Sequence, residues 1–498
     1  MSALGILLIP LVATALVCIP LPRRWPMGIT VAACVANLIL TGRLAWRLAA
    51  GETFVSALHM GMLKWIAVDG LSALILLLIA FVATTASVFS IGYLAHENLS
   101  PVKLRLYCAN YNLFVFSMLA VPMAAEPTLV WIMVELTTLC SALLVSFDNT
   151  QAALEAAWKY VLLSLMGAGL ALFGFLVLFA AMQAAGGGTY TWQGLLAAAP
   201  HMPPALLQTA FALILIGLGT KVGLVPMHTW LPDAHSQAPS PVCALLSGVE
   251  TTVILYVLLR LFPIMRTAPD SHAEAWAIVL GLISVGVAAF LLLQVRDYKR
   301  MFAFSTVENM GIILTAVGLG TAVANYSAMQ QIVAHSVTKS FCFFAAGSAL
   351  MAVGTREIAA VRGLIRRSPG AGTALVLGGL AITGAPPLAI FLSEFSILRA
   401  GLMQGRYVVT GLLAAFIVIA FFGVMLHINR MVFGAPNDEQ QTGSIADHTE
   451  GGHGNQFRLP FSCRIALVLA AVPMLLFGVY IPRPLHDLLA LASSALIP

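Results

Sequence analysis

Seven ionisable side chains interrupt long apolar stretches of this sequence, at positions where no water would solvate a charge. They are Glu135, Lys221, Glu250, Glu308, His335, Lys339 and Glu394. A charge at the centre of a membrane helix costs at least about 2.5 kcal/mol, so residues of this kind are expected to be functional. Burial disfavours the charged form of Glu and Lys alike, which brings proton exchange within reach of neutral pH. The set predicts a buried relay that carries protons or, as an alternative, Na⁺.

The spacing of one pair supports a relay. Lys339 follows His335 by four residues, so both side chains share one face of a helix, and Gln331 extends this polar stripe by one turn. A structural explanation stays open for each single charge, because a buried ion pair can simply hold two helices together. It accounts less well for charges in helix after helix, and we therefore favour transport.

Helix breakers lie close to two of these charges. Pro226 follows Lys221 by five residues, and the run Gly384-Ala385-Pro386-Pro387 ends seven residues before Glu394. Proline bends a helix and leaves a carbonyl without its partner. Broken helices at membrane depth are tolerated where they line a wet cavity, and they often mark an ion path. A plain proline kink is the alternative at either position.

Three further polar residues follow the first of these prolines, in the segment PMHTWLPDAH. His228, Asp233 and His235 are candidates for the point at which cytoplasmic protons gain access, with loop packing as the alternative. Two histidines seven residues apart, in a proline-rich segment with no third ligand, do not predict a metal site. The seven cysteines lie singly and form no CxxC pair, so we expect neither a metal nor another cofactor.

Composition indicates that lipid surrounds the elements carrying these residues. The chain has 498 residues, of which 60% are hydrophobic and 9% charged, and its mean hydropathy is +0.95. An ordinary soluble domain has about 25% charged residues. In such a protein the formal charge of +5 marks cytoplasmic loops and lipid headgroups, and it does not indicate nucleic acid.

Apolar runs long enough to span a bilayer predict an all-α, polytopic membrane protein with about 14 transmembrane helices. The runs start near residues 3, 27, 70, 104, 128, 157, 205, 240, 274, 301, 326, 374, 408 and 462. With the N-terminus outside, 15 of the 25 basic residues fall on the cytoplasmic side and 8 on the other, while Lys221 and Lys339 lie inside helices. This bias predicts that both termini face outward.

The segment from Lys221 to Val249, KVGLVPMHTWLPDAHSQAPSPVCALLSGV, carries a specific resemblance. It resembles the antiporter-like subunits of respiratory complex I, of Mrp-type Na⁺/H⁺ antiporters and of group 4 membrane-bound hydrogenases, and the likeness extends over about residues 70–435. The resemblance implies fourteen helices, with helices 4–8 and 9–13 as two inverted five-helix repeats and with helices 7 and 12 interrupted.

The corresponding division of the chain has five parts: helices 1–3 (1–100), the first repeat (101–265), the second repeat (270–434), a flexible cytoplasmic loop (435–460) and helix 14 (461–498). The resemblance also assigns single residues. It matches Glu135, Lys221, His335, Lys339 and Glu394 to the charged positions of helices 5, 7, 11, 11 and 12, and the segment with Asp297, Lys299 and Arg300 to the loop entering helix 10. The inverted repeat pairs Glu135 with Glu308 and Lys221 with Glu394.

Two departures refine the resemblance. Complex I relatives often have a lysine near the position of Thr252, whereas the ionisable residue near this position here is Glu250. Where those relatives have Ser-His, this chain has Glu308-Asn309. The phrases SGVETT and STVENMG are most similar to hydrogenase-4 and formate hydrogenlyase-type subunits. We therefore expect a route through Glu250 in place of the lysine-to-lysine relay between helices 7 and 11.

The function implied is proton translocation by one subunit of an energy-converting redox complex in the inner membrane of a bacterium or archaeon. Its partners would be the lipid bilayer and other membrane subunits, both antiporter-like subunits and those of a hydrogenase or quinone module, and the chain alone would have no redox activity. In this reading Glu135 tunes Lys221, the residues Glu250, His335 and Lys339 pass the proton laterally, and Glu394 holds the far end. A Na⁺/H⁺ antiporter subunit of the Mrp type and a structural membrane scaffold are the alternatives.

Overall fold

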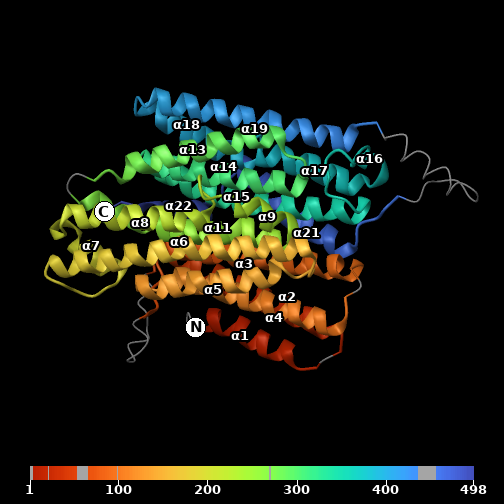
Figure 1. Cartoon of the computed structure of the whole chain (residues 1–498), viewed down its shortest axis with the longest axis horizontal. Helices are drawn as coiled ribbons and strands as arrows, with labels where there is room; N and C mark the ends of the chain where they lie inside the picture. The colour runs from red at the N-terminus through yellow and green to blue at the C-terminus, as the bar shows by residue number, and fades with distance from the viewer. Residues whose placement is uncertain are drawn as a thin grey trace, which may run out of the picture.

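The chain folds into a bundle of helices that run side by side. The computed structural model describes residues 4–20, 22–52, 65–97, 99–268, 271–435 and 456–497. Figure 1 shows the helices roughly parallel to the long axis of the molecule, with α1 at one edge and α19 at the other. Within the described residues, twelve helices are long and apolar enough to cross a membrane. The expected all-α, polytopic fold is confirmed.

Each apolar run expected from the sequence coincides with a helix. The helices are α1 (Leu4–Cys18), α2 (Trp25–Ala49), α3 (Gly70–His96), α4 (Pro101–Ala120), η2 (Val121–Met123), α5 (Pro127–Val145), α6 (Gln151–Ala184), α7 (Trp192–Ala198), η3 (Ala199–His201), α8 (Pro204–Val222), α9 (Trp230–Gln237), α10 (Ser240–Leu245), η4 (Leu246–Glu250), α11 (Thr251–Leu259), α12 (Leu261–Thr267), α13 (Ala273–Gln294), α14 (Tyr298–Gly318), α15 (Ala322–Val353), α16 (Leu364–Arg367), α17 (Pro369–Ile382), α18 (Ala389–Met403), α19 (Tyr407–Phe433), α21 (Phe461–Val479) and α22 (Arg483–Ser494). Because α1 and α17 are shorter than the twelve long spans, the number fourteen and the inverted repeats stay predictions.

Local sequence fixes where the longest helices begin and end. The hydroxyl of Thr150 accepts a hydrogen bond from the Ala153 amide and starts α6, and Thr321 does the same for α15 through the Ala324 amide, both at 3.1 Å. Side-chain caps of this kind satisfy amides that have no partner within the helix. Gly354, with φ 74°, ends α15 in the left-handed conformation that glycine adopts without strain.

Two spans are interrupted, at the positions where the sequence places its helix breakers. The Leu224 amide bonds to the carbonyl of Gly219 at 2.8 Å around Gly223, and the Ala385 amide bonds to the carbonyl of Leu380 at 2.9 Å around Gly384. Both glycines have positive φ, 87° and 68°. The chain therefore leaves α8 and α17 through the same type of turn before it continues as α9 and α18.

Two segments contain helices that the sequence did not predict. The loop between α6 and α8 contains α7, which the Thr191 hydroxyl caps at the Gly194 amide. The C-terminal segment 461–498 contains two helices instead of one, because the chain turns at Pro482 and restarts as α22. This last helix packs against α2, α3 and α15. The polar stretch 436–455, with His448 and His453, lies outside the described residues.

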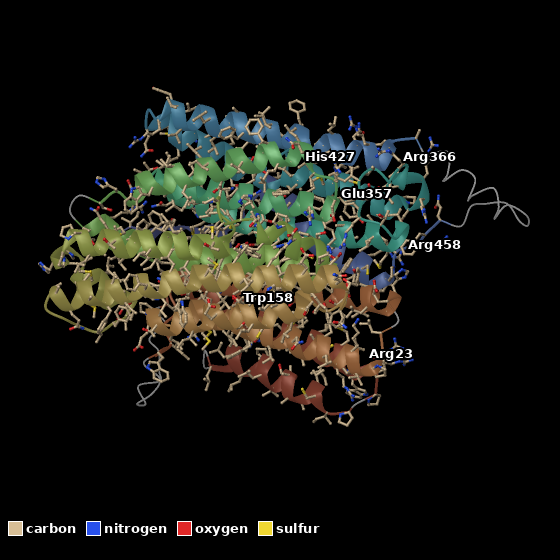
Figure 2. All side chains as sticks on the ribbon, in the orientation of Figure 1. Arg23, Trp158, Glu357, Arg366, His427 and Arg458 are labelled. Carbon is tan, nitrogen blue, oxygen red and sulfur yellow. The ribbon has the colours of Figure 1, made fainter. Side chains whose placement is uncertain are left out.

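Side chains on the outside of the bundle have the character expected for contact with lipid. Trp158 of α6 is 63% exposed, and Phe422 of α19 is 64% exposed. Figure 2 places Arg23, Arg366 and Arg458 at one end of the bundle. All three belong to the basic residues expected on the cytoplasmic side, so their common position agrees with the expected distribution of positive charge.

Glycines allow the closest contacts between helices. A Cβ at Gly217 of α8 would lie 2.5 Å from the Gly167 carbonyl and 2.5 Å from the Ala171 amide of α6, and a Cβ at Gly311 of α14 would lie 2.7 Å from the Gly281 carbonyl of α13. Small residues bring helix backbones together in membranes, where dispersion contacts replace the hydrophobic effect. The contact at Gly217 fixes the position of α8, which carries Lys221, against α6.

We expect Gly217→Ala to destabilise the protein by about 1–3 kcal/mol, because its methyl group would meet backbone atoms of α6 that cannot move away. The measurement is thermal unfolding of the purified chain in detergent. The matched control is Gly169→Ala on α6, where a Cβ meets no atom within 4 Å. Equal stability of the two variants would show that the α6–α8 contact is not tightly packed.

Candidate functional site

The buried ion pair between Lys221 and Glu135 is the centre of the first half of the site. Lys221 is the second-last residue of α8, and its side chain is 2% exposed. Its ammonium group donates to Oε1 of Glu135 and to the Val134 carbonyl, both at 2.8 Å. Glu135 comes from α5, and its Oε2 is buried without a hydrogen-bond partner. One carboxylate oxygen thus neutralises the lysine while the other is left for a water or a proton.

The interruption after α8 gives Lys221 its position at a helix end. The indole of Trp230, the first residue of α9, donates to the Thr220 carbonyl at 2.7 Å, and the Val225 amide donates to the Ser284 hydroxyl of α13 at 3.1 Å. Backbone groups that the break frees therefore find partners inside the protein, as a low-dielectric surrounding requires. The negative end of the α8 dipole also favours a cation at this position.

Glu250 ends a π-helical turn, η4, that interrupts the span from α10 to α11. Its Oε1 accepts hydrogen bonds from the Tyr160 hydroxyl of α6 at 2.9 Å and from the Ser141 hydroxyl of α5 at 3.3 Å. Its Oε2 is buried without a partner, and the residue is 3% exposed. Glu250 therefore faces the protein interior, and its charge interacts with that of Lys221. Single π-helical turns frequently occur at functional sites.

His335 and Lys339 lie on one face of α15, as their spacing predicted. His335 Nε2 lies 3.2 Å from the Ser247 carbonyl in η4, while its Nδ1 has no partner. The Ser247 hydroxyl lies 2.6 Å from the Thr306 hydroxyl of α14. The ammonium of Lys339 donates to the Ser305 hydroxyl at 2.6 Å and to the Phe302 carbonyl, both on α14. The π-helical turn thus contacts both α14 and α15.

Two acids, Glu308 and Glu394, complete the second half of the site, which also contains His335 and Lys339. Glu308 of α14 is 3% exposed, and its Oε2 has no hydrogen-bond partner. Its charge interacts with those of Lys339 and Glu394. Glu394 of α18 is 6% exposed, and its carboxyl group lies against the interruption, since a Cβ at Gly384 would be 2.2 Å from Oε2. Lys221 precedes Gly223 by two residues whereas Glu394 follows Gly384 by ten, so the two groups reach their breaks from opposite directions.

A hydrogen-bonded chain beside these acids was not predicted. The Ser393 hydroxyl of α18 donates to Oε1 of Gln331 on α15, and Nε2 of Gln331 donates to Oδ1 of Asn309 on α14 at 2.8 Å. Asn309 in turn donates to the Ser305 carbonyl at 2.8 Å. The polar stripe through Gln331 was one signal in the sequence. The positions of Ser393 and Asn309 directly beside Glu394 and Glu308 were another.

The three residues proposed for proton access do not form one cluster. Asp233 forms ion pairs with Arg300 at 2.6 Å and with Lys159 at 3.5 Å. His228 lies against the ring of Phe304. His235 is fully buried, and its Nδ1 lies 2.7 Å from the Leu231 carbonyl of its own helix while Nε2 has no partner.

Cations from the second half of the chain hold the C-terminal end of α9. Lys299 Nζ donates to the Ala238 carbonyl at 2.5 Å, and Arg356 donates to the Ser236 carbonyl at 2.6 Å. Asp297 caps α14 at two amides, accepts from the Ser236 hydroxyl at 2.7 Å and lies 3.3 Å from Arg356. Arg356 was not among the predicted site residues, because only the tertiary fold brings it to α9.

The seven predicted residues therefore form two groups. Glu135, Lys221 and Glu250 belong to the first, and His335, Lys339, Glu308 and Glu394 belong to the second. The η4 turn joins them, since it carries Glu250 at its end and presents the Ser247 carbonyl to His335. Figure 1 shows α9, α11, α14 and α15 at the centre of the bundle. Buried oxygen or nitrogen atoms without a hydrogen-bond partner lie in both groups, at Glu135, Glu250, Glu308 and His335.

Known proteins are similar to this chain in sequence and in fold. The family description "NADH:quinone oxidoreductase/Mrp antiporter, TM" matches residues 124–422, and "NADH-Ubiquinone oxidoreductase (complex I), chain 5 N-terminus" matches residues 62–100. The hydrogenase-4 component F homolog of Methylacidiphilum infernorum is 37% identical over 83% of this chain and 85% of its own length. Hydrogenase-4 component B of Escherichia coli is 29% identical over 66% of this chain, which spans only 49% of that protein.

Solved structures agree in fold. A chain of the membrane-bound sulfane sulfur reductase, an archaeal respiratory membrane complex, superposes with a TM-score of 0.86 over 99% of this chain and 97% of that one, at 22% identity. A chain of the Mrp complex from Dietzia sp. DQ12-45-1b gives a TM-score of 0.85 over 99% and 96%, at 20% identity. The chain belongs to the NADH:quinone oxidoreductase/Mrp antiporter transmembrane family, and it is an antiporter-like, membrane-embedded subunit of the kind found in complex I, hydrogenase-4 and Mrp-type assemblies.

Proposed function

We propose that the chain translocates protons as one subunit of a hydrogenase-4-like, energy-converting redox complex, in which partner subunits carry out electron transfer. The observation that carries this proposal is the buried Lys221–Glu135 pair at the end of an interrupted helix. A charge kept at this depth is costly, and a fixed ion pair alone does not require a break beside it. The similarity to the hydrogenase-4 component F homolog favours that type of complex.

The relay would work by Coulomb coupling between neighbouring groups. Two unit charges 4 Å apart interact by about 4 kcal/mol at an effective dielectric of 20. When a proton reaches Glu135, the attraction that holds the charge on Lys221 is lost, and Lys221 then releases its proton toward Glu250. Water would carry the proton from Glu250 to the imidazole of His335, which the Ser247 carbonyl of η4 positions at 3.2 Å. From there Lys339, Glu308 and Glu394 would pass the proton onward.

Partners and orientation follow from this proposal. Chains of similar fold are parts of multi-subunit membrane complexes, so we infer that other membrane subunits are partners of this chain, among them antiporter-like subunits and those of a hydrogenase or quinone module. The end of the bundle with Arg23, Arg366 and Arg458 would face the cytoplasm (Figure 2). Both termini would then lie on the outer side of the inner membrane, with access for cytoplasmic protons near Asp233, His228 and His235.

Na⁺ is the second candidate ion. The chain is 32% identical to the Na⁺/H⁺ antiporter subunit A1 of Staphylococcus haemolyticus over 70% of its length, which corresponds to 45% of that protein. Carboxyl oxygens of Glu250 and Glu308 without hydrogen-bond partners are the groups that a cation would use. Reconstituted flux measured with H⁺ and with Na⁺ separately distinguishes the two ions.

We expect Lys221→Met to abolish proton pumping while the complex stays assembled. Removal of one partner of a buried pair costs about 3–5 kcal/mol, so a double variant, Lys221→Met with Glu135→Gln, removes both charges and keeps the site neutral. The measurement is pumping in proteoliposomes, with assembly followed on a native gel. Lys103→Met, at a partly exposed lysine of α4 whose ammonium group lies over the Phe147 ring, is the control. Full pumping by the assembled double variant would favour the structural scaffold.

We expect Glu250→Gln to slow pumping by at least about a hundredfold, because proton-transfer groups contribute about 10²- to 10⁴-fold. Glu250→Asp should keep part of the rate, since it retains a carboxyl group. Unchanged pumping by the Gln variant would remove Glu250 from the relay.

The hydroxyl of Tyr160 provides a milder test of the same position. Tyr160→Phe removes the hydrogen bond to Glu250, worth about 1 kcal/mol, together with the contact to the Ser141 hydroxyl at 2.7 Å, so pumping should fall about fivefold. Tyr107→Phe is the matched control, because the Tyr107 hydroxyl is also buried but bonds to Ser90 at 2.9 Å, between α3 and α4. If both variants lower pumping equally, the effect belongs to the fold and not to Glu250.

A further inference from the structure

A cavity of about 690 Å³ lies between α17 and α21. Both helices pack against α15, whose Phe341 contributes to the wall of the cavity. Its walls are mainly apolar, and they include Leu377 of α17 together with Leu467 and Val468 of α21. A slot with this lining and volume accommodates an aliphatic chain in preference to a polar solute.

Small side chains on α17 keep the slot open. Gly370, Thr373 and Ala374 face it over two successive turns, and Ala471 faces it from α21. Thr373 is exposed although it lies within this apolar region. Larger residues at these positions would close the gap between the helices, so the sequence itself maintains the slot.

Two arginines line the same cavity. Arg458 precedes α21 and Arg464 lies in its first turn, and both are exposed. The guanidinium group of Arg464 lies over the ring of Phe461, with 5.6 Å to the ring centroid. Among the residues that the structure describes, no carboxylate forms an ion pair with either arginine. Within the described residues, the two guanidinium groups at the mouth of the slot therefore have no carboxylate counter-charge.

We propose that this slot binds an anionic phospholipid, with an acyl chain between α17 and α21 and its phosphate at Arg458 and Arg464. Charge complementarity supports this occupant, because basic pockets between membrane helices on the cytoplasmic side bind anionic headgroups. Figure 2 places Arg458 at the same end of the bundle as Arg23 and Arg366, where positive residues gather. An arginine can bind a phosphate through two parallel hydrogen bonds. A zwitterionic lipid also has a phosphate, but its headgroup has no net negative charge, so we expect the two arginines to bind it more weakly.

The site differs from the proton pathway in position and in chemistry. Its lining contains none of the seven relay residues. It lies on α21 and at the start of α17, whereas Glu394 lies beyond the interruption on α18. Phe341 does connect the two regions, since it belongs to α15 two residues after Lys339. A bound lipid would therefore contact the helix that carries His335 and Lys339 without contacting either side chain.

The test measures lipid retention by native mass spectrometry on the purified, delipidated full chain. Phosphatidylglycerol and phosphatidylcholine with identical acyl chains are added separately, and inorganic phosphate serves as a competitor. Arg458→Gln combined with Arg464→Gln removes the headgroup contact, and Thr373→Trp fills the slot. Arg296→Gln is the matched control, because this arginine is also exposed, lies in the turn before α14 and does not line the cavity.

We expect the unmodified chain and the Arg296→Gln control to retain one more phosphatidylglycerol than the double arginine variant. The apparent affinity for that molecule should fall about thirtyfold when both arginines are lost, and Thr373→Trp should abolish its binding. Equal retention of phosphatidylcholine, or no loss in the double variant, would overturn the proposal. Displacement by inorganic phosphate would also overturn the proposal, because the arginines would then bind a free anion. Unchanged retention by Thr373→Trp would overturn it as well, because the acyl chain would then not occupy the slot.

Discussion

The ion pair between Lys221 and Glu135 sets the conditions that the surrounding structure has to meet. An ammonium group taken out of water requires a counter-charge, further hydrogen-bond acceptors and a favourable local dipole. The structure supplies these as the Glu135 carboxylate, the Val134 carbonyl and the C-terminal end of α8. A helix end at this depth is only tolerable when other side chains satisfy its free carbonyls, and Trp230 does this at Thr220.

The interruption makes each half of the chain depend on the other. Once α8 ends at Lys221, its continuation α9 is a helix of only eight residues, too short to be stable alone. Its C-terminal carbonyls are held by Lys299 and Arg356, which belong to the second half. The cations also lie where the dipole of α9 favours them. Hydrogen bonds therefore join the segment after the Lys221 break to the start of α14, the helix that carries Glu308.

The sequence predicted those features that depend on residue type and spacing. Apolar runs located the helices, Pro226 and the run from Gly384 to Pro387 marked the two breaks, and the four-residue spacing placed His335 and Lys339 on one face. The η4 turn could not be predicted, because no residue type in LSGVE requires a π-helical turn instead of an α-helical one. The hydrogen bonds of Glu250 with Tyr160 and Ser141 depend on how α5, α6 and η4 pack. The ion pair between Asp233 and Arg300 depends in the same way on how α9 and α14 pack.

The two halves of the site have similar breaks and the same balance of lysines and acids, and this balance has a consequence for proton content. The buried pathway contains two lysines, Lys221 and Lys339, and four acids, which are Glu135, Glu250, Glu308 and Glu394. Fully ionised, it would carry a net charge of −2 in a region where uncompensated charge is costly. Two protons on the acids restore neutrality. Because each half has one lysine and two acids, each half reaches neutrality with one proton. Under the proposed function, a proton that moved from one half to the other would therefore separate charge across the η4 turn, and the Coulomb energy of that separation would favour a compensating transfer.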